Sequence, residues 1–129
     1  QNLGRDRFRY AYAMKTFAEH GIVAAASSDA PVVPVDPLLG IETMVTRLDR
    51  LGQDAWVEER ISVEEAIRAY TVNAAFASHD ETRKGTLKPG YLADITVFDR
   101  DLRSIAPTEI HTAHVDATIQ DGAVVHERP

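Results

Sequence analysis

Apolar and polar positions near the start of this chain predict a helix followed by a buried strand. Between residues 5 and 19 the apolar side chains recur at helical spacing, and His20-Gly21 supplies a stop signal. Residues 22–26 are then continuously apolar, which is typical of a strand covered on both faces. A helix followed by a fully buried strand is the repeating unit of a parallel α/β fold.

The segment after this strand is predicted to be an irregular but stiff loop. It carries three prolines between residues 27 and 37, and proline restricts the backbone while removing an N–H donor. Asp36-Pro37 then places an N-cap residue before a proline at the first helical position, which predicts a helix over residues 37–50. A rigid loop at the end of a strand is suited to hold functional groups in place.

A capping box begins the next predicted helix. Ser62 and Glu65 have the spacing at which each side chain satisfies a free backbone amide of the other residue. We therefore expect a helix over residues 63–73. Residues 74–78 are expected to add another turn or a short helix.

Beyond residue 79 the pattern changes to that of short strands. Residues 95–98 and 115–125 are rich in β-forming side chains, and Asp121-Gly122 interrupts the second run with a strong hairpin signal. These features predict a second, antiparallel module. We place the boundary so that residues 1–82 form one part of the chain and residues 83–129 the other.

Composition narrows the function classes without choosing among them. The 129 residues are one domain's length, and their apolar runs are shorter than the ~20 residues that a membrane-spanning helix needs. We see no signal peptide and expect a cytoplasmic protein. A net charge of −6 without basic clusters argues against nucleic acid or membranes as partners. The absence of cysteine excludes thiolate metal sites, so any metal must bind histidine, carboxylate or other oxygen ligands.

Six short motifs follow one another in a recognisable order. They are SSDAPV at 27–32, DPLLG at 36–40, SVEEA at 62–66, YTVNAA at 70–75, GTLKPG at 85–90 and ADI at 93–95. In combination they resemble the C-terminal portion of the amidohydrolase superfamily, and most closely the group that includes N-substituted formamide deformylases. The resemblance covers nearly the whole chain.

The resemblance implies a metal-dependent hydrolase with a (β/α)8 TIM barrel and a small β-sandwich. Residues 1–82 would be the C-terminal part of the barrel, with 22–26 as its last strand, and residues 83–129 part of the sandwich. Asp29 matches the family's catalytic acid, which contacts the metal or its bound water. The implied cofactor is a divalent metal, with Zn²⁺ expected, and the implied substrate is a small molecule with a non-peptide amide-type carbon–nitrogen bond. The other ligands belong to the part before Gln1, so we expect this chain to be a piece of a longer enzyme and to be inactive alone.

From the residues alone, Asp29 allows two interpretations. It is either a loop aspartate that caps a nearby amide or a carboxylate at the tip of a parallel strand, where α/β enzymes carry their chemistry. Beside a divalent metal, such a carboxylate can take a proton from water and pass it to the leaving nitrogen. The resemblance favours this second role. Ser27 and Ser28 either orient Asp29 or simply allow the strand tip to pack.

Other polar residues are interpreted as structural. His111 and His114 are three residues apart, which places them on opposite faces of a strand, so shared metal ligation would require a turn. The remaining histidines are assigned surface or structural positions. Asp94 is expected to start the strand at residue 95.

A second hypothesis is a non-catalytic remnant or scaffold module. An open barrel edge at residues 22–26 would leave backbone groups and apolar side chains without partners. The chain would then fold by self-association, as a homo-oligomer through this edge, or by pairing with another chain.

Overall fold

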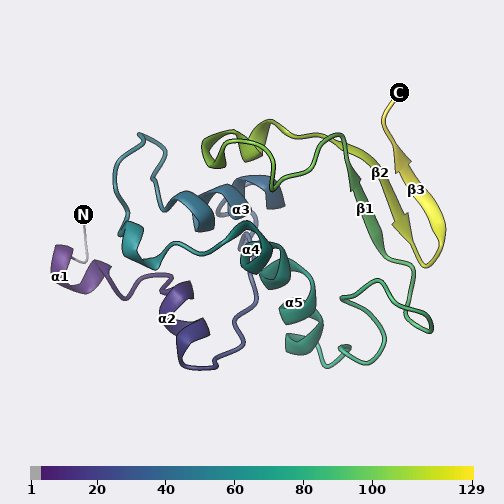
Figure 1. Ribbon diagram of the computed structural model, residues 1–129, viewed down its shortest axis with the longest axis horizontal. Helices are drawn as coiled ribbons and strands as arrows, with labels where there is room; N and C mark the ends of the chain where they lie inside the picture. The colour runs from purple at the N-terminus through teal and green to yellow at the C-terminus, as the bar shows by residue number, and fades with distance from the viewer. Residues whose placement is uncertain (1–3) are drawn as a thin grey trace.

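The computed structural model describes residues 4–129 and contains short helices followed by a small antiparallel sheet (Figure 1). The helices occupy one end of the molecule and the sheet the other. The elements are α1 (Arg5–Phe8), α2 (Met14–Glu19), α3 (Pro37–Thr46), η1 (Val57–Glu59), α4 (Val63–Tyr70), α5 (Val72–Ala77), β1 (Ile95–Phe98), η2 (Pro107–Thr112), β2 (Val115–Gln120) and β3 (Ala123–Glu127).

Both predicted helix starts are confirmed. The Asp36 carboxylate accepts the N–H of Leu38 at 2.9 Å and caps α3, and Ser62 and Glu65 form the complete capping box of α4. The ends differ from the prediction. Helix α3 ends at Thr46 because Arg47 adopts the left-handed conformation with φ 54°, so residues 47–50 are not helical.

The single helix predicted over residues 5–19 is wrong, because α1 and α2 are separated by a break. Tyr12 has a φ of 52° in this break. The guanidinium of Arg47 donates to the carbonyls of Ala11 and Tyr12. The Thr16 N–H, which a continuous helix would direct to residue 12, is donated to the Glu59 carboxylate at 2.9 Å. Tertiary hydrogen bonds therefore replace the helical ones.

The buried strand predicted over residues 22–26 does not form within residues 4–129. The segment is extended but belongs to no sheet in the part of the chain described, and the side chains of Ile22 and Val23 are 55% and 48% exposed. It runs past α4 on its way to α3 (Figure 1). A strand is defined by a neighbour that shares its hydrogen bonds, and residues 4–129 supply no such neighbour here.

The predicted antiparallel module is confirmed as a three-stranded sheet in the order β1-β2-β3. Asp121 and Gly122 join β2 to β3 with φ values of 48° and 80°, as expected for a two-residue hairpin turn. The Asp94 carboxylate accepts the N–H of Asp121 at 2.9 Å. Asp94 is therefore structural, and it ties the start of β1 to the hairpin turn.

One hydrophobic core joins the helices to the C-terminal part. Helix α3 packs against both α4 and η2. The proposed division into residues 1–82 and 83–129 stays a prediction. No helix within residues 4–129 is long and apolar enough to span a bilayer. The buried core residues are Leu38, Ile41, Ile61, Ala66, Leu102, Ile110 and Ala113.

Candidate functional site

Asp29 lies in a turn at the end of the extended segment. Its own N–H donates to the Ser27 hydroxyl at 3.2 Å, and its carbonyl accepts the N–H of Val32 at 2.9 Å. The side chain is exposed, and the backbone has a φ of 52°. Within residues 4–129 no group donates a hydrogen bond to the Asp29 carboxylate. The Asp29 side chain thus does not cap a backbone amide within residues 4–129. Its carboxylate is open to a ligand, while hydrogen bonds to Ser27 and Val32 hold its backbone.

Asp29 is the acid that the sequence nominates for a metal site, and it belongs to no group of three metal-ligating side chains within residues 4–129. Within the described part of the chain, no three histidine, aspartate or glutamate side chains lie close enough to hold a metal ion. A carboxylate oxygen suits a divalent cation. The described residues could therefore provide one ligand to a metal, the Asp29 carboxylate.

Asp29 lines neither of two hollows on the surface formed by residues 4–129. The first, of about 200 Å³, lies between α2, α4 and the extended segment, with Ala24 and Asn73 in its wall. The second, of about 390 Å³, lies beside α3 and contains Glu42 and His111. Neither hollow gathers a set of catalytic groups around the predicted acid.

The histidines at 111 and 114 bind different carboxylates. His111 Nδ1 lies 2.6 Å from a Glu42 oxygen, and the same oxygen accepts the His111 backbone N–H at 2.9 Å. This contact joins η2 to α3. His114 Nδ1 lies 3.4 Å from Asp99. Their interpretation as structural residues agrees with these separate contacts.

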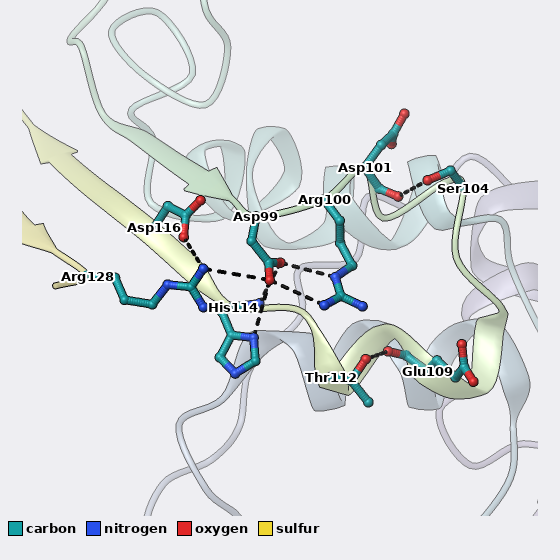
Figure 2. Close-up of polar contacts among 9 residues, drawn as sticks. All are labelled: Asp99, Arg100, Asp101, Ser104, Glu109, Thr112, His114, Asp116 and Arg128. Atoms are coloured by element: carbon teal, nitrogen blue, oxygen red, sulfur yellow. Dashed lines mark hydrogen bonds and ion pairs between the residues drawn. The ribbon is translucent and has the colours of Figure 1, made fainter.

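The densest polar cluster surrounds Asp99, just after β1 (Figure 2). Its carboxylate accepts the backbone N–H of His114 at 2.9 Å and faces the guanidinium groups of Arg100 and Arg128. Arg128 also pairs with Asp116 at 2.7 Å. The hydrogen bond from His114, followed by those from Arg100, lowers the pKa of Asp99 to about 2. With its oxygens engaged, Asp99 links β1, β2 and the C-terminal residues instead of offering a free acid.

Sequence reasoning missed this cluster because an irregularity in strand pairing sets the register at this end of the sheet. Val97 pairs with Ala117 but Phe98 pairs with Val115, so the register shifts by one residue between them. Without this shift Asp99 would lie opposite Val115, and the shift brings it beside His114.

Comparison with known proteins identifies the family. The sequence profile of the amidohydrolase family matches residues 1–126. The chain belongs to the amidohydrolase family. It is 39% identical over 98% of its length to YtcJ, a protein of Bacillus subtilis named as an amidohydrolase, and 29% identical over 91% to the N-substituted formamide deformylase of Arthrobacter pascens. A crystal structure of an amidohydrolase from Thermotoga maritima superposes on 89% of the chain with a TM-score of 0.64 and 26% identity.

These matches confirm the resemblance drawn from the motifs and also show its extent. The alignments cover 24% of the Bacillus protein, 22% of the deformylase and 26% of the Thermotoga chain. This amidohydrolase chain therefore spans about a quarter of the length of the relatives it matches.

Two of the motifs that carried the resemblance are in contact. Gly85, which opens the GTLKPG motif, has a φ of 93° and lies against the TVNAA motif. A Cβ at this position would lie 2.8 Å from the Cβ of Ala75 and 3.2 Å from the carbonyl oxygen of Thr71. The contact between the two motifs therefore depends on Gly85, because only a residue without a Cβ lets the backbone approach Ala75 and Thr71 so closely.

Proposed function

We propose that this chain supplies the metal-proximal acid of a metal-dependent amidohydrolase that hydrolyses a non-peptide carbon–nitrogen bond. The carrying observation is Asp29, whose carboxylate has no hydrogen-bond donor within residues 4–129 while its backbone is held in a turn. Membership of the amidohydrolase family supports the reaction class. A relative named as a formamide deformylase supports a small amide-type substrate.

The chemistry proposed for Asp29 is proton transfer. A divalent metal, when bound, would lower the pKa of a coordinated water to about 7. The Asp29 carboxylate would accept a proton from the attacking water and then donate it to the leaving nitrogen, acting first as base and then as acid. Ser27 would support this role by holding the Asp29 N–H. We propose zinc as the metal because its ligand set accommodates carboxylate and histidine without cysteine.

The architecture that we propose for the whole enzyme explains the exposed segment. Residues 22–26 would be the last strand of a (β/α)8 barrel, residues 1–82 its C-terminal part, and residues 83–129 a portion of a β-sandwich. A complete barrel takes about 250 residues, so this chain alone would lack the other strands and ligands. The exposed Ile22 and Val23 side chains would then pack against the missing barrel. We expect the chain alone to be inactive.

The proposal is tested by substituting Asp29→Asn in the full-length protein that contains this sequence. The amide keeps the shape of the side chain but cannot act as a base, so kcat should fall about 10²- to 10⁴-fold on a formamide or related small amide. Asp6→Asn is the matched control, because Asp6 is also an exposed aspartate and lies in α1. A kcat for Asp29→Asn equal to that of the control would refute the assignment.

A non-catalytic module that self-associates is the second candidate, favoured by the exposed apolar side chains of Ile22 and Val23. Sedimentation of the isolated chain over a range of concentrations, with and without added Zn²⁺, separates the two hypotheses. Stable oligomers of this chain, together with no amidase activity in the full-length protein, would favour the module. A monomeric chain and an active full-length enzyme would exclude it.

A further inference from the structure

We infer that Asn73 is a positioning residue for Asp29, a role that rests on the function proposed above. The Asn73 side-chain amide donates from Nδ2 to the carbonyl oxygen of Ala24 at 2.9 Å, across 49 residues of sequence. Nearby, the N–H of Ala26 donates to the carbonyl of Ala69 at 3.0 Å. These two bonds attach the extended segment to the junction of α4 and α5, just before Asp29.

The break between α4 and α5 makes both bonds available. The last carbonyls of a helix have no intrahelical donor, and α4 ends at Tyr70 because Thr71 adopts φ −119° and ψ −84°. Thr71 satisfies two of them, since its hydroxyl donates to Ile67 at 2.9 Å and its N–H to Arg68 at 3.2 Å. The next carbonyl, that of Ala69, is left to accept from the extended segment.

The geometry of an extended chain explains why the two contacts work together. The C=O of one residue and the N–H of the residue two positions later point to the same edge. Ala24 and Ala26 therefore present an acceptor and a donor on one edge of the segment, and Asn73 and Ala69 provide the complementary groups. The junction thus replaces the neighbouring strand that the segment lacks on this edge.

An asparagine fits this position better than its closest substitutes. Position 73 is the second residue of α5, so its short side chain starts close to the helix junction and reaches Ala24. Aspartate has the same shape but no donor, and its charge would face a carbonyl oxygen. Alanine would remove the bond and leave the partly buried Ala24 carbonyl without this donor.

The segment that Asn73 holds lies only a few residues before the proposed catalytic acid. Asp29 is three residues beyond Ala26, and a stiff turn that includes Pro31 follows it. If the Ala24 to Ala26 edge shifts, the carboxylate shifts with it. A displacement of about 1 Å of a reacting group lowers the rate about 10²-fold. Asn73 would therefore affect kcat without touching the substrate.

The test compares Asn73→Ala and Asn73→Asp with Ser62→Ala in the full-length protein. Ser62→Ala removes the N-terminal cap of the same helical unit but lies at the other end of α4, so it controls for general destabilisation. Two measurements are made: kcat and KM for hydrolysis of the same formamide or related small amide, and amide hydrogen exchange in residues 22–29.

We expect both Asn73 variants to show kcat reduced about 10- to 100-fold, with KM within about 2-fold of the wild type. Exchange of the Ala26 amide should become about 5- to 10-fold faster. Ser62→Ala should change neither. If Asn73→Ala fails to fold, Asn73→Asp retains the shape needed to make the comparison.

Unchanged exchange at residues 22–29, or unchanged kcat in a folded Asn73 variant, would overturn the positioning role. An equal loss of kcat in Ser62→Ala would show that the effect is only destabilisation. Full activity in Asp29→Asn would instead overturn the proposed function, so the two failures are distinguishable.

Discussion

Removing the Arg47 side chain is expected to loosen the N-terminal helices from the rest of the protein. Arg47 is 5% exposed and lies just after α3, where its guanidinium donates to Ala11 at 3.0 Å, Tyr12 at 3.3 Å and Trp56 at 3.4 Å. Burial lowers the pKa of Arg47, while the charges of Glu59 and Asp54 oppose this shift. The side chain thus holds the break between α1 and α2.

The magnitude follows from the geometry of these bonds. A hydrogen bond from a charged donor contributes about 1.5–3 kcal/mol, and only the bond to Ala11 has ordinary length. Counting about 2 kcal/mol for it and about 1 kcal/mol for the two long bonds together gives a loss of about 3 kcal/mol for Arg47→Ala. Arg47→Gly should lose about 1 kcal/mol less, because glycine adopts the φ of 54° without strain.

Urea unfolding followed by circular dichroism measures both free energies of unfolding. Hydrogen exchange in residues 5–19 should also rise in both variants, because this is the segment that Arg47 holds. Equal stability of Arg47→Ala and the wild type would refute the hydrogen-bond argument. A glycine variant less stable than the alanine variant would refute the argument from backbone strain.

Two further predictions concern the motif contact and the sheet. Gly85→Ala should lower the free energy of unfolding by about 2–4 kcal/mol, because the added Cβ meets Ala75 and the backbone has a φ of 93°. In the control variant Gly122→Ala no atom lies within 4 Å of the added Cβ, so it should lose only about 1 kcal/mol through backbone strain. Equal losses of the two variants in urea unfolding would contradict the packing argument. The pKa of Asp99 is lowered to about 2, so its contribution to stability is complete above the ordinary aspartate pKa of about 4 and is lost as the pH falls toward 2. In Asp99→Asn the free energy of unfolding should therefore depend less on pH in this window. An unchanged pH dependence between the wild type and this variant would count against the contact with His114.

Signals that act over a few residues were readable from the chain itself. The cap at Asp36, the box of Ser62 with Glu65 and the hairpin at Asp121 each depend on residues that are close in sequence, and each formed as expected. Asp29 was nominated in the same way, from an apolar run that ends on a carboxylate. Its proposed role came from the order of the motifs, since its local turn is compatible with many functions.

The errors arose where the backbone found partners far away in sequence. Residues 5–19 have the periodicity of one helix, yet Arg47 and Glu59 bind the backbone groups that a continuous helix would have used. Residues 22–26 have the composition of a buried strand, yet within residues 4–129 they contact a helix junction on one edge, and the side chains of Ile22 and Val23 are exposed.

The sequence by itself thus determined the family, the helix caps, the hairpin and the candidate acid, because these are encoded by short patterns and their order. Only the tertiary structure decided where the N-terminal helix breaks, what holds the segment before Asp29, and how Asp99 closes the sheet. The physical reason is that backbone amides and carbonyls must find partners. Local sequence shows which groups need one, while the packing of distant segments decides which partner each group obtains.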